Sequence, residues 1–129
     1  MRTRIAVSLA LVAGFGLGAV AIEGLHAQAK PPVYFIAEID VHDMDAYMKE
    51  YAPKARPIIL SYGGKFLASG SKLMPLEGEP PKSRVVIQQW DSVEKMMAWR
   101  NSAEYKEARK TGEKYASFRA FAIEGVPQQ

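Results

Sequence analysis

Three polar side chains lie within segments that otherwise have the composition of β-strands. Glu38, Gln88 and Arg119 occur in VYFIAEIDV, RVVIQQW and SFRAFAIE respectively. Half-buried strands are costly places for unpaired polar groups. One interpretation is therefore a ligand cavity, with Glu38 as a general base, Arg119 binding an anion and Gln88 orienting the ligand. A carboxyl group in a closed cavity could act as a base through a raised pKa.

The alternative for these residues is structural. Glu38 could form an ion pair between strands, with either Arg84 or Arg119, as charged residues on strands often do. Gln88 and Gln89 are adjacent in one strand, so their side chains lie on opposite faces of the sheet. Alternation does not show which of the two faces the cavity.

A second polar group lies in AWRNSAEYKEARK, which has the pattern of a helix interrupted at Asn101 and Ser102. Both residues favour helix caps over helix interiors. Ser102 is expected to cap a new helix, with Tyr105 packing in the core. The alternative is that Asn101, Ser102 and Tyr105 form a polar corner that binds a ligand, beside Trp99 as a wall of the core or cavity.

Other catalytic motifs are weak or missing. The chain has no cysteine, and His42 is the one histidine beyond residue 29. The segment HDMD offers one histidine and two flexible carboxylates, which is not a closed ligand set. There is no phosphate-binding glycine loop, HExxH motif or nucleophile elbow, and no well-placed haem ligand. No cofactor or metal is expected.

The first 29 residues resemble an export signal. Arg2 and Arg4 precede an uncharged, mostly apolar stretch from Ile5 to Ile22, and Ala27-Gln28-Ala29 matches a signal-peptidase site. We expect cleavage after Ala29 and a periplasmic or secreted domain of residues 30–129. The alternative is a retained N-terminal membrane anchor, because the stretch reaches the lower limit for spanning a bilayer.

The charge left after cleavage is mild. Removing Arg2, Arg4 and Glu23 from the 17 basic and 14 acidic residues leaves 15 and 13. The charges alternate in sign along EYKEARKTGEK, as on a solvated helix face. No basic stripe with interleaved aromatic residues stands out, so a nucleic-acid partner is not expected.

The remaining pattern predicts strands, helices and a fold class. Strands are expected at 33–41, 65–69, 84–90 and 117–124. A helix follows Asp43, is bent or broken by Pro53 and Pro57, and ends at Gly63-Gly64. A second helix starts with Asp91 and Glu94 and continues beyond Ser102 to about Tyr115. The order β-α-β-β-α-β defines an α+β, ferredoxin-like fold with a four-stranded antiparallel sheet and helices on one face.

The other face of this sheet would carry both apolar and polar side chains. That composition suits a homodimer, a dimeric α/β barrel in which two sheets face each other around a cavity. A monomer with a solvated sheet face is the alternative. A strand-exchanging tetramer also stays open.

Several segments resemble the domain-of-unknown-function family 1330: YFIAEIDVHDMDAYMKEYAPKA, GGKFLASG, RVVIQQWDSVEKMMAW and AWRNSAEYKEARK. The resemblance runs from Val33 to about Val126. It implies the ferredoxin-like fold and the dimeric α/β-barrel superfamily, which also contains cofactor-free monooxygenases, muconolactone isomerase-like enzymes and dye-decolorising peroxidases. The family has no assigned reaction.

Two functions follow as hypotheses. The first is an exported, dimeric protein that binds a small apolar or aromatic molecule without chemistry, in a cavity between facing sheets. The second is a cofactor-independent monooxygenase or isomerase acting on such a molecule, with Glu38 or another cavity group as its base. They differ in whether Glu38, a glutamine of the third strand and Arg119 converge in one enclosed pocket.

Overall fold

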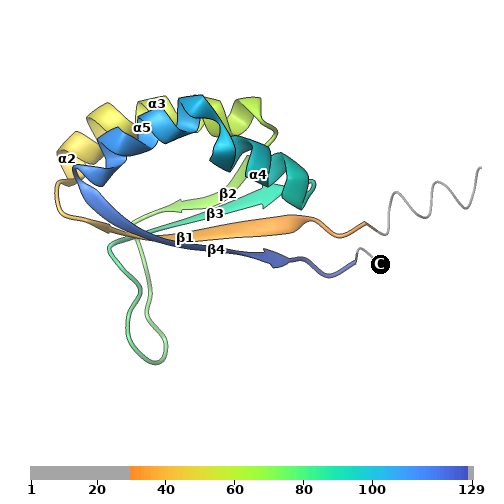
Figure 1. The fold of residues 1–129 in the computed structure, drawn as a ribbon. Coiled ribbons are helices and arrows are strands. Elements are labelled where there is room, and N and C mark those ends of the chain that lie inside the picture. The colour runs from red at the N-terminus through yellow and green to blue at the C-terminus, as the bar shows by residue number, and fades with distance from the viewer. Residues whose placement is uncertain (1–29, 128–129) are drawn as a thin grey trace, which may run out of the picture. The chain divides into compact units, whose positions relative to one another are not determined.

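Four strands form one antiparallel sheet in the order β2-β3-β1-β4 in the computed structural model, which describes residues 30–127 (Figure 1). The strands are β1 (Val33–Val41), β2 (Lys65–Gly70), β3 (Arg84–Trp90) and β4 (Ala116–Glu124). They belong to one compact unit, Pro32–Gly125, to which all features below belong. The helices cover one face of the sheet, and the predicted ferredoxin-like fold is confirmed.

The first helical run connects β1 to β2 without interruption. It consists of α2 (Met44–Ala46), a π-helical turn η1 (Tyr47–Tyr51) and α3 (Ala52–Ser61). The Asp43 carboxylate caps it by accepting a hydrogen bond from the Ala46 amide at 3.1 Å. The break that the two prolines could have caused does not occur. Pro53 lies in the first turn of α3, where its missing amide donor costs little, and α3 continues through Pro57.

The second helical run is divided as the sequence predicts. Helix α4 (Val93–Asn101) ends at Ser102, whose extended backbone redirects the chain into α5 (Ala103–Glu113). Ser102 Oγ accepts from the Tyr105 amide at 3.2 Å and donates to the Trp99 carbonyl at 2.8 Å. One side chain thus satisfies backbone groups at both helix ends. The start of α4 differs from expectation: its cap is Ser92, not Asp91, which instead pairs with Lys95.

Aromatic side chains dominate the layer between helices and sheet. Every second residue of β1, from Val33 to Ile39, is buried against the helices. The Trp90 and Trp99 rings stack with centroids 5.2 Å apart, and Phe35 meets Trp99 edge-on at 5.1 Å. These large rings hold α4 against the middle of the sheet.

The turn between α3 and β2 requires two glycines. Gly63 has φ +100°, a backbone conformation that other residues rarely adopt. A Cβ atom on Gly64 would lie 2.6 Å from the Trp90 ring and 2.7 Å from Ile59. The two glycines that are predicted to end the helix therefore also determine how closely α3 approaches β3.

The face of the sheet that carries no helix is called the open face here. It carries the alternate residues of the strands, including Tyr34, Ile36 and Glu38 of β1. The loop between β2 and β3 extends away from the helices on this side (Figure 1). None of the helices in residues 30–127 is long and apolar enough to cross a bilayer. The predicted leader, residues 1–29, lies outside the described residues.

Candidate functional site

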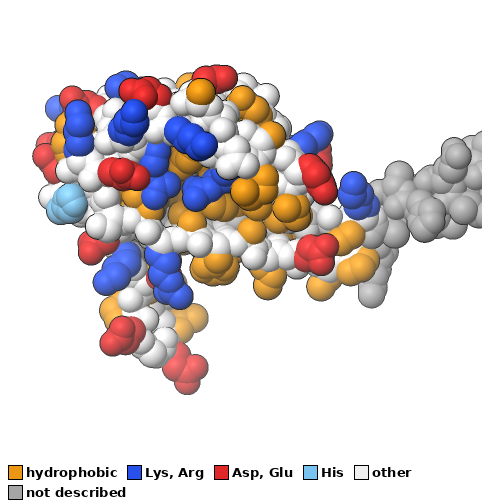
Figure 2. Space-filling model, in the orientation of Figure 1, with side chains coloured by type: hydrophobic (Ala, Val, Ile, Leu, Met, Phe, Trp, Pro, Cys, Tyr) orange, Lys and Arg blue, Asp and Glu red, His pale blue; other side chains and the backbone are white. Residues whose placement is uncertain are grey.

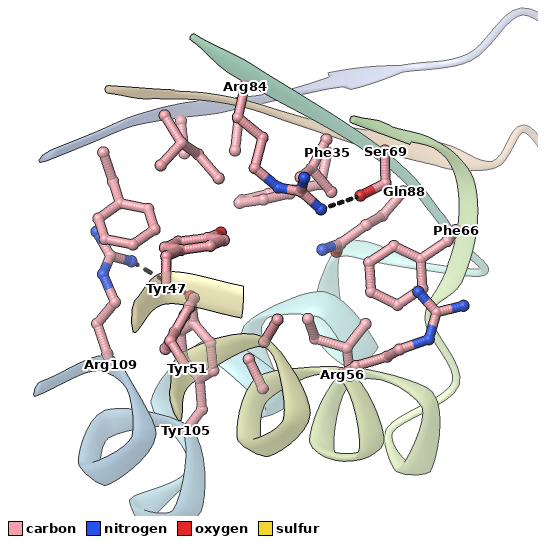
Figure 3. Close-up of a pocket in the computed structure, with 18 of the residues that line it drawn as sticks. Phe35, Tyr47, Tyr51, Arg56, Phe66, Ser69, Arg84, Gln88, Tyr105 and Arg109 are labelled. Carbon is pink, nitrogen blue, oxygen red and sulfur yellow. Dashed lines mark hydrogen bonds between the residues drawn. The ribbon is translucent and has the colours of Figure 1, made fainter. Parts of the chain in front are cut away.

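A cavity of about 310 Å³ lies between the sheet and the helices of the chain (Figure 3). Its walls come from all four strands and from η1, α3, α4 and α5. Most of the lining atoms are apolar, and the volume lies at the lower end of the range of small-molecule sites. The sequence pattern favours a cavity on the open face, whereas this one lies on the opposite side of the sheet.

The sheet supplies the floor through its period of two. Phe35, Ala37 and Ile39 of β1 all face the cavity, as do Val86 and Gln88 of β3. Gln88 is only 2% exposed, and its Oε1 accepts a hydrogen bond from Trp90 Nε1 at 2.9 Å. That bond fixes the Gln88 amide, whose nitrogen remains available to a ligand.

A β-bulge in the edge strand adds a further polar group. The pairing of β2 with β3 shifts by one residue between Phe66 and Ala68. Phe66 and Ser69, three residues apart, therefore both line the cavity, although strict alternation would place them on opposite faces. Ser69 Oγ accepts a hydrogen bond from Arg84 Nη2 at 2.8 Å.

The π-helical turn supplies two tyrosines to the opposite wall. Tyr47 and Tyr51 are both buried, with ring centroids 5.2 Å apart. The Tyr51 hydroxyl lies 3.4 Å from the Tyr105 hydroxyl, which in turn accepts a hydrogen bond from Arg109 Nη1 at 3.2 Å. Three phenol groups thus enter one apolar cavity from two helical runs. π-Helical turns occur frequently at functional sites.

Burial changes the acidity of these phenols. It raises the pKa of Tyr47, and the nearby positive charge of Arg84 partly opposes that effect. Burial also raises the pKa of Tyr51, with the neighbouring Tyr105 acting in the same direction. Both hydroxyls are therefore neutral at physiological pH, and each can donate a hydrogen bond to a ligand.

Arginines supply all the charge in the cavity wall. Arg56, Arg84, Arg100 and Arg109 line it, and the described lining residues include no aspartate, glutamate, lysine or histidine. Each guanidinium lies over an aromatic ring, most closely Arg109 at 3.6 Å from the Phe118 centroid. In Figure 2, basic side chains border apolar surface between the helices and the sheet.

Three predicted site residues line the cavity: Gln88, Trp99 and Tyr105. The other two members of the polar corner do not. Ser102 acts as the cap between two helices, and Asn101 is exposed at the end of α4.

Glu38, Gln88 and Arg119 do not share a face of the sheet, so these three side chains do not line one pocket in this chain. A pocket with Gln89, the other glutamine that alternation leaves open, would lie on the open face and stays a prediction. Glu38 and Arg119 are directly paired across β1 and β4 on the open face, and their side chains form an ion pair at 2.9 Å. Gln88 faces the helices instead. The inter-strand pairing that the sequence leaves open is the arrangement observed, and the Arg119 side chain is 76% exposed.

Arg84, Tyr47 and Tyr51 line the cavity without having been predicted as site residues. Arg84 has the same strand parity as Val86 and Gln88, so alternation alone could have placed it on the cavity side. The two tyrosines lie on an apolar helix stripe, a pattern that predicts core positions. His42 is exposed, and no cluster of potential metal-binding side chains occurs among residues 30–127.

The chain belongs to a protein family that is recognised by its sequence. The model of the domain of unknown function DUF1330 matches residues 32–126, and the chain is a member of that family. No curated protein has a significant sequence match to the chain.

Solved structures share the fold. A protein of unknown function from Rhodopseudomonas palustris is 19% identical, with a TM-score of 0.61 over 82% of this chain and 92% of that one. SnoaB, a cofactor-independent oxygenase from Streptomyces nogalater, is 13% identical, with a TM-score of 0.55 over 77% of this chain and 95% of that one.

Proposed function

We propose that this protein binds a small, largely apolar molecule in the cavity between its sheet and its helices. The observation that carries the proposal is the apolar cavity of about 310 Å³, partly open to solvent, into which a few fixed polar groups point. Well-packed cores leave few voids larger than a water molecule. An apolar cavity with convergent polar groups is instead the usual form of a ligand site.

The test uses a neutral dye and a matched pair of variants. N-phenyl-1-naphthylamine fluoresces more strongly in apolar surroundings, so its titration reports occupancy of the cavity. Ala37 lines the cavity floor, whereas Ala98 is exposed on α4 and lines no part of it. Ala37→Leu should occupy part of the space and weaken dye binding, and Ala98→Leu should leave dye binding unchanged. No dye binding by the parent protein, or equal binding by both variants, would contradict the proposal.

We also propose that two copies pair through the open face. Phe121 and Ile123 of β4 are 48% and 58% exposed there, beside the half-buried Ile36 and Ile87. Exposed apolar groups of this kind favour burial against a second sheet. Native mass spectrometry should show a dimer that Ile123→Glu dissociates. A monomeric parent would contradict this part of the proposal.

Export to the periplasm is a further part of the proposal, supported by Arg2, Arg4 and Ala27-Gln28-Ala29. Expression of the full chain in a Gram-negative host should give a periplasmic protein that begins at Lys30. A membrane-bound protein of full mass would indicate the retained anchor instead.

A second candidate function is cofactor-independent oxygenation or isomerisation of an aromatic molecule. It is favoured by the buried phenols in the cavity and by the fold shared with SnoaB. Glu38 lies outside this cavity, so it could serve as base only in a space that a partner copy encloses on the open face. Oxygen uptake with a hydroxynaphthalene tests the oxygenase form. Equal turnover by the parent and Glu38→Gln would exclude Glu38 as the base.

A further inference from the structure

All the charged side chains in the cavity wall are positive. Four arginines line it, and Arg56, Arg84 and Arg100 form no salt bridge with any described residue. Arg109 has one acidic neighbour, with its Nε 3.7 Å from Glu113. Cationic groups beside apolar walls are stabilised by an opposite charge, which this part of the chain does not provide for three of the four.

Three of these guanidinium groups also have hydrogen-bonding capacity that is not used. Arg84 Nε, Arg100 Nη1 and Arg109 Nε are buried from solvent, and none has a hydrogen-bond partner among residues 30–127. A buried donor without a partner is uncommon in a native protein, and a bound ion or ligand can satisfy such a donor. All three side chains line the cavity, so an anion bound there could satisfy one or more of these donors.

The surroundings of Arg84 indicate where such an anion would bind. Its Nη2 is held by Ser69 at 2.8 Å, and its guanidinium lies 5.6 Å from the centroid of the Tyr47 ring. In Figure 3 the side chains of Arg84, Gln88 and Tyr47 point toward the same space. Guanidinium, amide and phenol groups all donate hydrogen bonds, and a planar guanidinium matches a carboxylate in geometry.

The rest of the space suits a flat ring. Phe35, Phe66, Tyr47 and Trp99 contribute aromatic surface to the walls. Aromatic rings pack on one another in stacked or edge-on geometry. We propose that the cavity selects a small aromatic carboxylic acid, with the carboxylate bound at Arg84 and the ring among these aromatic side chains. The inference rests on the proposed function, since it names the chemical class of the ligand for the same cavity.

Two probes of nearly equal shape test this inference by isothermal titration calorimetry on the protein. 2-Naphthoate carries the carboxylate, and 2-naphthamide replaces it with a neutral amide. The parent should bind 2-naphthoate about tenfold or more tightly than 2-naphthamide. Arg84→Gln should remove this preference while 2-naphthamide binding persists, which also shows that the variant is folded. Arg100→Gln, which should weaken the preference, is the second variant.

The control arginine lies on the opposite side of the sheet. Arg119→Gln removes the same charge from the open face, so it should leave the preference for 2-naphthoate unchanged. Equal affinities of the parent for the two probes, tighter binding of 2-naphthamide, or an equal effect of Arg119→Gln and Arg84→Gln would overturn the inference. Binding of the neutral dye without binding of 2-naphthoate would also overturn it and leave the proposed function standing. Failure of the dye and both naphthalene probes would overturn both.

Discussion

A Cβ atom on Gly112 would lie 2.8 Å from two carbons of the Tyr51 ring, so α5 packs directly on that tyrosine. Tyr51 also contacts the rings of Tyr47 and Phe118. A methyl group at position 112 would therefore collide with a ring that lines the cavity.

Gly112→Ala should thus reduce ligand binding and stability together. Overpacking costs on the order of 1–3 kcal/mol, and the better helix propensity of alanine returns roughly 1 kcal/mol. Urea unfolding followed by circular dichroism should show a net loss, and dye binding should weaken. Gly70→Ala is the control, because a Cβ atom there meets nothing within 4 Å. A Gly112→Ala protein as stable as the parent, with full dye binding, would contradict this packing.

Adjacent glutamines of β3 should respond differently to the same substitution. Gln88→Leu would leave the indole N–H of Trp90, which is fully buried, without its acceptor. An unsatisfied buried donor costs about 1–3 kcal/mol. Gln89→Leu changes a half-buried side chain on the open face and should alter the free energy of unfolding by about 0.5 kcal/mol or less. Equal effects in urea unfolding would mean that the bond from Trp90 contributes nothing.

The fold could be predicted from local signals because each one has a local cause. Alternation from Val33 to Ile39 marks a strand with one buried face, and Ser102 marks the junction between two helices. The structure differs from the sequence-based prediction at two places in the helices, and each difference also has a local cause. Pro57 is accommodated inside α3, and the cap of α4 is Ser92, one position after the expected Asp91.

The site could be predicted only in part, because it depends on register and on a bulge. Residue type and local pattern predict Trp99, Tyr105 and one of two adjacent glutamines as site residues, and the structure places Gln88 in the cavity. The pairing of Glu38 with Arg119 follows from the register of β1 against β4, which residues 81 apart in sequence do not reveal. The extra residue in β2 that turns Ser69 toward Arg84 has no mark in the sequence KFLASG.

Ser102 should prove to be a structural residue and not a ligand contact. Ser102→Ala removes its bonds to the Tyr105 amide and the Trp99 carbonyl. Loss of an N-cap costs about 1 kcal/mol, so the free energy of unfolding should fall by roughly that amount. Asn101→Ala, at an exposed neighbouring position, should have almost no effect. Neither variant should change the affinity for 2-naphthamide, and a large loss of affinity with Asn101→Ala would restore the hypothesis of a ligand-binding polar corner.

The burial of Tyr51 should make stability fall in alkaline solution. Its pKa is raised in the folded protein by burial, whereas an unfolded tyrosine ionises near about pH 10. Above that pH the unfolded chain has lost a proton that the folded chain retains, so the unfolded state gains stability as the pH rises. Tyr51 alone should contribute a decline in the free energy of unfolding of up to about 1.4 kcal/mol per pH unit.

Urea unfolding of the parent and Tyr51→Phe from about pH 8 to about pH 11, a range that spans the ordinary tyrosine pKa, measures this contribution. The two curves should be parallel below about pH 10, and the variant should decline less steeply above it. Identical slopes throughout would show that Tyr51 ionises as readily in the folded protein as in the unfolded chain.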